Sequence, residues 1–335
     1  MKVGKKRLAA AAIVAAIAVV TYAFSFNHKI ARFFSHELVI SIAGDIMLDR
    51  GVAGQISQNG ALYPFENVIG VFTEDDITIA NLECPLTAAE VQMTKEIVFK
   101  ADPKSVDTLK SAGFDALMLA NNHAMDYLPV GLADTMTALD SAGLYYAGAG
   151  DPGEIKPCFI RRNGIRVGII SYSLFPPDTI NELSGPDIAY VREGHLDDMQ
   201  SEVASAAAQC DFLIVYYHWG IEYRHDVSDI QIEIAHAAVD SGASAVIGTH
   251  PHVLQGRETY KGAPVYYSIG NFVFDNQIPD GTDETVILQF TVGKNGLLDV
   301  RELPVVINNC QPQFPDAQKA AEIITNLERY SQRFD

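Results

Sequence analysis

Five apolar runs in this sequence, each typical of a buried β-strand, are followed by side chains that can bind metal ions or move protons. These side chains are Asp45, Glu83, Asn122 with His123, His218, and His250 with His252. In open α/β sheets, functional sites form beyond the carboxyl ends of the strands. If the strands are parallel neighbours, we expect these side chains to converge at one edge of the sheet.

The donor types indicate a site for one or two divalent metal ions. Carboxylates, an asparagine carbonyl and neutral imidazoles, without thiolates, suit Mn, Fe or Zn. A carboxylate between two ions can bridge them, and such a pair activates water for displacement at phosphorus. Each element also has a simpler interpretation: Gly44-Asp45 suits a turn, and Asn121-Asn122 suits a turn or a helix cap. Repetition after several separate strands favours the metal site.

Strand-like and helical segments alternate along the chain and must position these residues. The strands expected before the polar ends are 39–43, 77–80, 116–120, 212–217 and 245–248, and later or additional strands are expected at 167–171, 265–268, 285–292 and 298–306. The expected helices are 103–112, 132–142, 196–208, one from Ser228 to about Asp240, and 317–333. An Asn163-Gly164 hairpin is expected before the strand at 167. This alternation predicts an α/β domain with much parallel sheet.

The N-terminus suggests a membrane anchor. Residues 1–36 contain six basic and no acidic residues, and residues 8–26 carry no charge. A helix of that length, at about 1.5 Å per residue, nearly crosses a hydrocarbon core of about 30 Å. We favour a retained signal anchor over a cleaved signal peptide, because the small-residue cleavage pattern is weak; a buried helix of a cytosolic domain is the third alternative. The basic end predicts a cytoplasmic tip.

We therefore expect residues 1–36 to form a cytoplasmic tip, a transmembrane anchor and a linker, and residues 37–335 to form one extracytoplasmic domain. The protein would be a single-pass protein of the cell membrane, or secreted if the segment is cleaved. The formal net charge of −18 argues against nucleic-acid binding, which depends on Lys and Arg. The four cysteines are far apart and lack a C-x-x-C pair, so disulfides and separate thiols both remain open.

Seven motifs run in order from about residue 40 to residue 275. They are SIAGDIMLDRG, YPFENV, ANLECPLT, SAGFDALMLANNHAMDY, YYHWGIEY, GASAVIGTHPHVLQG and YYSIGNFVFD. Together they resemble the CapA family of poly-γ-glutamate capsule proteins. That family is similar to calcineurin-like metallophosphoesterases, and the resemblance implies an α/β fold with a four-layer α-β-β-α sandwich following the N-terminal transmembrane helix.

The resemblance also implies a role for each residue of the site. One metal ion would be held by Glu83, Asn122, His218 and His250. A second ion would be held by Asp45, Glu83 and His252. His123 would donate a proton or contact phosphate, and Asp126 would orient it.

The first motif departs from the metallophosphoesterase pattern. That pattern has Asp-x-His, but Met47 stands where the histidine is expected. A single ion, or a weak second one, is therefore an alternative to a full pair. Asp49 is the residue that would compensate if the loop curled back. The departure weakens the expectation of efficient phosphoester hydrolysis more than that of metal binding.

Three functions follow from these observations. The first is a membrane-anchored protein that takes part in poly-γ-glutamate synthesis, export or attachment, with the polymer or its synthesis complex as partner. The second is a secreted metal-dependent phosphoesterase acting on another phosphoester. The third is a non-catalytic scaffold of the polymer-synthesis complex. An acidic body does not attract a polyanion over long range, so polymer binding would need local cations or the metal. The basic residues near the motifs are Arg50, Lys95, Lys100, Arg224 and Arg257.

Overall fold

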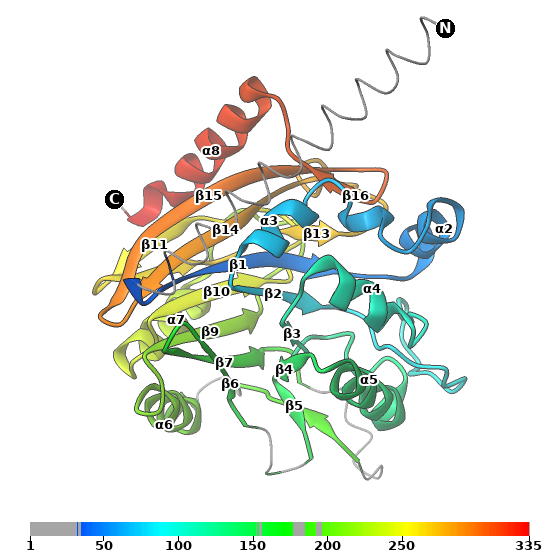
Figure 1. Cartoon of the computed structure of the whole chain (residues 1–335), viewed down its shortest axis with the longest axis horizontal. Coiled ribbons are helices and arrows are strands. Elements are labelled where there is room, and N and C mark those ends of the chain that lie inside the picture. Colours follow the sequence, from blue (N-terminus) through cyan, green and yellow to red (C-terminus); the bar gives the residue numbers. More distant parts are fainter. Residues whose placement is uncertain are drawn as a thin grey trace, which may run out of the picture.

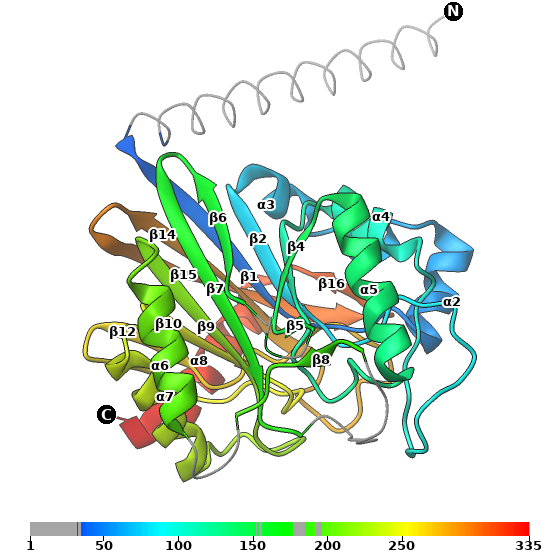
Figure 2. The same ribbon diagram turned by 90° about the horizontal axis from the view of Figure 1, so that it is seen from below.

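The computed structural model describes residues 32, 35–151, 153, 156–176, 185–191 and 196–334. Within them, the chain forms two large β-sheets stacked between helices, together with a small two-stranded ribbon (Figures 1 and 2). The expected mixed α/β class is confirmed. None of the helices in this part of the chain is long and apolar enough to cross a membrane. The expected anchor at residues 8–26 lies outside the described residues.

The first sheet contains the strands that precede Asp45, Glu83 and His123. In spatial order, its described strands are β16 (Gln311–Gln313), β15 (Gly296–Asn308), β14 (Glu284–Gly293), β1 (Glu37–Ile46), β2 (Ile77–Leu82), β3 (Ala116–Met118) and β4 (Tyr145–Ala147), with β13 (Asn271–Val273) pairing beside β1. β1 to β4 run parallel to one another. Their carboxyl ends therefore lie at the same edge of the sheet.

The second sheet contains the strands that precede the other three histidines of the site. Its described strands, in spatial order, are β11 (Arg257–Tyr260), β12 (Ala263–Tyr266), β10 (Ala245–Thr249), β9 (Phe212–His218), β7 (Ile165–Ser173) and β6 (Cys158–Arg162). β12, β10, β9 and β7 are parallel neighbours. The ribbon pairs β5 (Ala149–Gly150) with β8 (Asp187–Ile188).

Apolar side chains fill three interfaces between these layers. Between the sheets, alternate residues such as Ile40 and Ile42 of β1 pack with Ile214 of β9, as the two-residue period of a strand requires. The other face of the first sheet is covered by α2 (Arg50–Asn59), α3 (Ile69–Glu74), α4 (Ser105–Ala112) and α5 (Leu128–Ala142), with the short helix η1 (Tyr63–Phe65). The other face of the second sheet is covered by α6 (Leu196–Ala207) and α7 (Asp229–Asp240).

The last helix covers the end of the interior between the sheets. α8 (Ala317–Ser331) lies along β15 (Figure 1) and is followed by η2 (Gln332–Phe334). It contributes the buried side chains of Ile323 and Leu327 to the apolar cluster between the two sheets. Asp316 caps its first turn by accepting a hydrogen bond from the Lys319 backbone N–H at 2.9 Å.

Several local signals in the sequence form as expected. Asn163 and Gly164 link β6 to β7 with φ angles of 50° and 82°, the backbone conformation that a two-residue hairpin requires. Ser228 and Gln231 form a capping box at the start of α7. The four cysteines, whose pairing the sequence left open, are free thiols in the structure.

Several expected boundaries are wrong by two to four residues, and three of them are described here. α4 begins at Ser105 instead of 103, because Asp102 first accepts hydrogen bonds from two backbone N–H groups in a preceding turn. α5 begins at Leu128 instead of 132, since its start has no side-chain cap that would mark it. The strand expected at 265–268 is β12 (Ala263–Tyr266), which includes a proline and pairs with β11.

Candidate metal centre

The structure brings together all eight residues that the sequence analysis selected. In the first sheet, Asp45 lies near the end of β1, Glu83 directly follows β2, and the segment after β3 carries Asn122, His123 and Asp126. In the second sheet, His218 ends β9, and His250 and His252 follow β10. The contacts below join these two groups, so the carboxyl ends of both sheets face one another around a single cluster.

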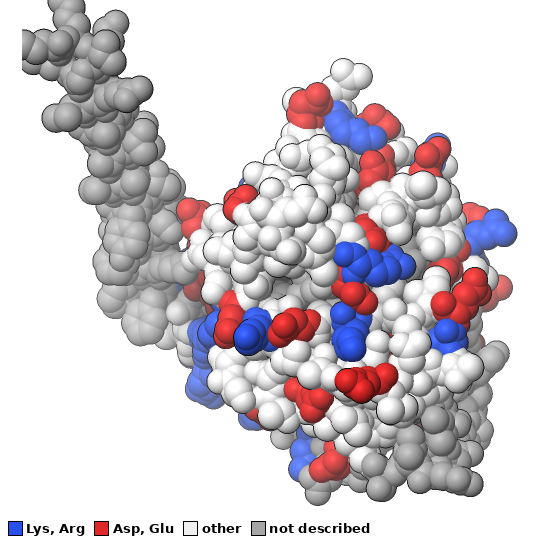
Figure 3. Space-filling view, turned by 90° about the vertical axis from the view of Figure 1, so that its right-hand side faces the viewer, with Lys and Arg blue, Asp and Glu red and all other residues white. Residues whose placement is uncertain are grey.

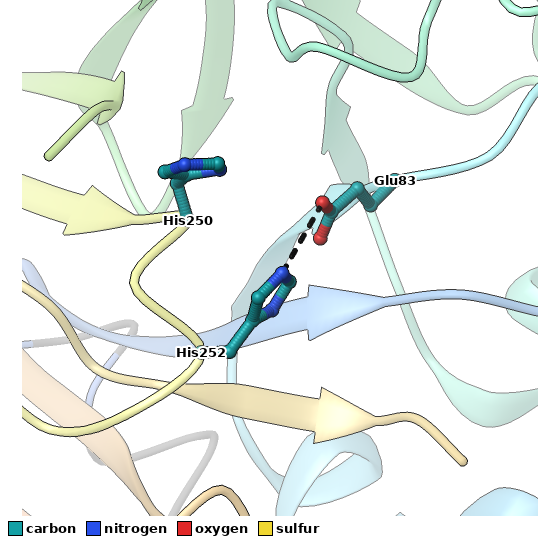
Figure 4. A group of neighbouring side chains, drawn as sticks. All are labelled: Glu83, His250 and His252. Atoms are coloured by element: carbon teal, nitrogen blue, oxygen red, sulfur yellow. Dashed lines mark ion pairs between the residues drawn. The ribbon is translucent and has the colours of Figure 1, made fainter. Parts of the chain in front are cut away.

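Three residues form the centre of this cluster. Glu83, His250 and His252 each offer one ligand atom, and these atoms lie within 4.8 Å of one another. His252 Nε2 is 3.9 Å from Glu83 Oε1, and the two side chains point toward each other, with His250 on the adjoining loop (Figure 4). Two imidazoles and a carboxylate at this spacing are suitable ligands for a divalent cation.

The Glu83 carboxylate provides the test of whether a metal ion fits here. Its side chain is fully buried, and neither oxygen has a hydrogen-bond partner among the described residues. Burial raises the pKa of this carboxyl well above its ordinary value, and the neighbouring Asp45 carboxylate raises it further. A buried carboxylate without a partner is costly. A bound cation would provide the missing partner, so the residues present fit a metal ion.

His218 connects the second sheet to Asn122. Its Nε2 lies 2.8 Å from Asn122 Oδ1, 3.1 Å from His250 Nδ1 and 3.6 Å from Glu83 Oε1. Burial lowers the pKa of both histidines well below the ordinary value, and nearby imidazoles lower it further. Neutral imidazole is the form that binds metals. These four residues are the set that the resemblance implies for the first ion.

Asp45 occupies the other side of the cluster. Asn81 Nδ2 donates a hydrogen bond to its Oδ1 at 2.7 Å, and the His250 backbone N–H donates to its Oδ2 at 3.1 Å. His252 Nδ1 lies 3.8 Å from the same Oδ2. Burial raises the pKa of the Asp45 carboxyl, although His252 and these hydrogen bonds favour its ionised form. Asp45, Glu83 and His252 thus lie together as the second set requires.

The His250-Pro251-His252 turn has an unusual backbone. His250 and His252 have φ angles of 92° and 58°, in the left-handed region that non-glycine residues seldom adopt. His252 Nδ1 lies 2.8 Å from Asn271 Oδ1, which fixes the ring and directs Nε2 toward Glu83. Strained backbone and oriented imidazoles are both common at functional sites.

Met47, which stands where the first motif would have its histidine, packs in the core and does not join the cluster as a ligand would. Met47 is fully buried in the apolar cluster beneath the helices of the first sheet. Asp49, the residue that would compensate, instead caps α2 by accepting a hydrogen bond from the Arg50 backbone N–H at 2.7 Å. Its other carboxylate oxygen accepts from the Lys100 backbone N–H, also at 2.7 Å. Asp49 therefore does not take the place of the missing histidine, and the second set has three protein residues.

His123 lies beside the cluster in a buried pair with Asp126. His123 Nδ1 is 2.7 Å from Asp126 Oδ2, which also accepts a hydrogen bond from the Phe99 backbone N–H at 2.6 Å. Lys95 Nζ is 2.5 Å from the other oxygen, Asp126 Oδ1. The Phe99 ring packs on the imidazole at 4.0 Å between centroids. Asp126 therefore holds one ring nitrogen and leaves the other for proton transfer.

The comparison with protein families covers this whole cluster. A family model described as "Bacterial capsule synthesis protein PGA_cap" matches residues 39–276, more than half of the chain. The chain belongs to this capsule synthesis family. The matched range contains every residue of the cluster, from Asp45 to Asn271, so the site lies within the part that defines the family.

Individual relatives agree with this family. The PGA biosynthesis protein CapA of Bacillus subtilis (strain 168) is 32% identical over 316 residues, which is 90% of this chain and 81% of the relative. The capsule biosynthesis protein CapA of Bacillus anthracis is 31% identical over 290 residues, 83% of this chain and 70% of the relative. A crystal structure of a hypothetical protein from Thermus thermophilus superposes with a TM-score of 0.51 at 16% identity, over 80% of this chain and 98% of that one. That likeness concerns the fold alone.

Two asparagines of this family member support the site, although the sequence analysis did not select them. Asn81, the second-last residue of β2, lies between Asp45 and Asn121, donating to the first at 2.7 Å and accepting from the second at 3.1 Å. Asn271 in β13 orients His252. Both are amides in fully buried strands that are otherwise apolar except for Thr78 of β2. A polar residue inside an apolar strand is the signal that would have found them.

Gly44 precedes Asp45, and a substitution there tests whether the site needs the close backbone packing at this position. A Cβ at this position would lie 2.0 Å from the Gly270 carbonyl oxygen, which is backbone and cannot move aside. We expect Gly44→Ala to lower the free energy of unfolding by about 3 kcal/mol and to reduce bound metal, measured by urea unfolding and elemental analysis.

The matched control is Gly54→Ala in α2, where nothing lies within 4 Å of an added Cβ. That change should leave stability unchanged or raise it by about 0.5–1 kcal/mol, because alanine is preferred to glycine inside a helix. Equal urea-unfolding midpoints for Gly44→Ala and the wild type would contradict the argument that a Cβ at position 44 collides with the Gly270 carbonyl.

Proposed function

We propose that this chain is a membrane-anchored, extracytoplasmic protein that takes part in the synthesis, export or attachment of poly-γ-glutamate. The observation that carries the proposal is the family match together with the two Bacillus relatives, whose names refer to PGA and capsule biosynthesis. These relatives are matched over most of their own length, so the likeness extends beyond a shared fold. The partner would be the polymer or its synthesis complex.

The proposed location rests on the amino-terminal sequence. Residues 8–26 carry no charge and follow a basic tip, which favours a single membrane span with the tip in the cytoplasm. Residues 37–335 would then lie outside the cell, next to the membrane surface at which a capsule polymer emerges. Cleavage of the segment would release the same domain as a secreted protein.

The proposed cofactor is one or two divalent ions, with Mn, Fe or Zn suited to the nitrogen and oxygen donors. Glu83, Asn122, His218 and His250 would hold the first, and Asp45, Glu83 and His252 the second. When bound, a cation of this kind lowers the pKa of water and polarises a phosphoryl or carbonyl oxygen. The layered sheets with the cluster at their strand ends support the metallophosphoesterase-like interpretation of the fold.

The charges around the protein favour local recognition of an anionic polymer. Basic and acidic side chains are interspersed on the face shown in Figure 3, and the protein has a net charge of −18. Two basic residues near the site already pair with acids, Lys95 with Asp126 and Arg50 with Asp275. A polyanion would therefore be recognised by individual groups and by the metal, not by a broad positive surface.

A second candidate function is a metal-dependent phosphoesterase that acts on another phosphoester. The buried His123–Asp126 pair favours it, because it places an oriented imidazole beside the proposed metal ligands. In this case His123 would deliver a proton to the leaving oxygen while Asp126 holds its Nδ1. The experiment on this pair is described in the Discussion.

The proposed role in the capsule is tested by deleting the gene for this chain in its own bacterium. We expect extracellular poly-γ-glutamate to fall at least tenfold, measured by polymer isolation and glutamate analysis after hydrolysis. The wild-type chain should restore it, whereas Glu83→Gln should not if the metal is needed. An unchanged polymer layer would contradict the proposal, and restoration by Glu83→Gln would favour a scaffold.

A further inference from the structure

A cavity of about 310 Å³ lies at the edge of the second sheet and contains none of the residues of the metal cluster. It is bounded by the end of β7, by α6, and by Gly148 and Ala189, which are joined by a backbone hydrogen bond. β5 and β8 lie beside the end of β7 (Figure 2). The volume is at the lower end of the range for small-molecule sites, roughly 300–1,000 Å³. It therefore suits a ligand the size of an amino-acid unit.

The floor of the cavity contains a hydroxyl without a partner. Ser171 is 1% exposed, and its Oγ has no hydrogen-bond partner among the described residues. Gly148 packs directly against it, with a φ of 87°, and an added Cβ would lie 2.9 Å from the Ser171 Cβ. A side chain at position 148 would thus press on the floor. The glycine therefore allows Ser171 to pack at the floor of the cavity.

The remaining wall groups carry both signs of charge. Tyr172 donates a hydrogen bond from its hydroxyl to Glu202 Oε2 at 2.6 Å, which fixes the carboxylate at the wall. Burial raises the pKa of Tyr172, so the phenol stays protonated and keeps donating. Two exposed residues, Lys156 and Gln209, also line this cavity, one with a cationic and one with an amide side chain. A ligand that satisfies these groups has an ammonium for Glu202 and a carboxylate for Lys156.

We propose that this cavity binds a free α-amino-acid head, and specifically the amino-terminal unit of a poly-γ-glutamate chain. In such a polymer every unit keeps its α-carboxylate, but only the amino-terminal unit also has a free ammonium. The paired charges of the cavity match that unit and not the interior ones. The choice of a glutamyl unit rests on the proposed function; the preference for an amino-acid head follows from the cavity alone.

The position of the cavity relates it to the metal centre. Ser171 is two residues before Ser173, which is the register partner of His218 across β7 and β9. Two residues of strand span about 7 Å. The chain then continues to Phe175, whose ring lies 4.2 Å from that of His250. The end of β7 therefore links the wall of the cavity to the edge of the metal centre.

The test is calorimetric titration of the full chain in detergent with the dipeptide γ-glutamylglutamate. We expect saturable binding that weakens at least tenfold when the dipeptide is N-acetylated, since acetylation removes the ammonium. Glu202→Gln and Lys156→Met should each weaken it at least tenfold, and exposed Lys156 can be changed without disturbing the core. Glu233→Gln, on the exposed side of α7, is the matched control and should bind as the wild type does.

Two results would overturn the inference: equal affinity for the free and the N-acetylated dipeptide, or wild-type affinity in Lys156→Met. The outcome is independent of the capsule experiment. Loss of polymer on gene deletion without dipeptide binding would remove the cavity assignment and leave the proposed function. Dipeptide binding with an unchanged capsule would support the cavity and remove the proposed function.

Discussion

Replacing Glu83 by glutamine is expected to abolish metal retention while making the metal-free protein more stable than the wild type. The carboxylate is the residue shared by both proposed ligand sets, and its two oxygens have no other partner among the described residues. A ligand present at 100 to 1,000 times its Kd stabilises the folded state by about 2.7–4.1 kcal/mol. We expect that gain in the wild type and less than about 1 kcal/mol in Glu83→Gln.

The loss of bound metal and the gain in stability of the metal-free protein can be separated by measuring stability at two pH values. Burial raises the pKa of Glu83 well above its ordinary value of 4.5, so the folded state binds this proton more tightly than the unfolded state does. The free energy of unfolding that depends on this group therefore falls as pH rises above about 4.5. Glutamine carries no such penalty. In the absence of metal, the two proteins should be equally stable near pH 4.5, and the variant should become the more stable one toward neutral pH.

The measurements are elemental analysis of the purified full chain and thermal unfolding with and without a chelator at both pH values. Glu233→Gln serves as the control, because Glu233 lies on the exposed side of α7 and belongs to neither proposed ligand set. It should retain metal and follow the wild-type pH dependence. Wild-type metal content in Glu83→Gln would contradict the proposed ligand set.

The convergence of the site was predictable from the sequence, for a physical reason. Each apolar run is long enough to identify a buried strand, and parallel strands place their carboxyl ends together. Knowing which residues followed each run was therefore enough to select Asp45, Glu83 and His218 without knowing the order of the strands. Their binding of a metal remains a prediction, because the structure establishes their proximity and not an ion.

The parts that were not predictable depend on contacts between distant segments. β13 is three residues long and pairs with β1 across more than two hundred residues of sequence. Neither its hydrophobic pattern nor its length therefore identifies it as a strand in the sequence. Asn271 was missed for that reason. Asp49 was interpreted as a residue that could compensate because its carboxylate is close in sequence to Asp45, yet that carboxylate caps α2 at Arg50 and accepts a hydrogen bond from the Lys100 backbone. Sequence proximity did not reveal which backbone groups it would satisfy.

Replacing Asp126 by asparagine is expected to lower phosphodiester turnover about 100-fold while leaving bound metal unchanged. Asp126 holds His123 Nδ1 at 2.7 Å and is itself fixed by the Phe99 backbone N–H and by Lys95. Proton transfer by a positioned side chain contributes roughly 10²–10⁴-fold to a rate. Neither residue belongs to the proposed ligand sets, so the loss should appear in kcat. The assay is hydrolysis of bis(p-nitrophenyl) phosphate by the metal-loaded full chain.

The pH profile distinguishes positioning of His123 from a general loss of structure. Burial lowers the pKa of His123, whereas Asp126 raises it. Removing the Asp126 charge therefore lowers this pKa further. If the protonated imidazole delivers the proton, the decline of activity on the alkaline side should move to lower pH in Asp126→Asn, and His123→Asn should lose that limb entirely. A merely unfolded fraction would reduce the amplitude without moving the limb.

The matched control is Asp107→Asn, an exposed position in the first turn of α4, which should keep both the rate and the pH profile of the wild type. The double variant His123→Asn/Asp126→Asn should be no slower than His123→Asn alone, because Asp126 acts through His123. Additive losses would contradict that coupling. If the metal-loaded wild type hydrolyses no phosphodiester, the phosphoesterase candidate fails, and the buried pair then serves to hold the loop after β3 against the cluster, as a scaffold would require.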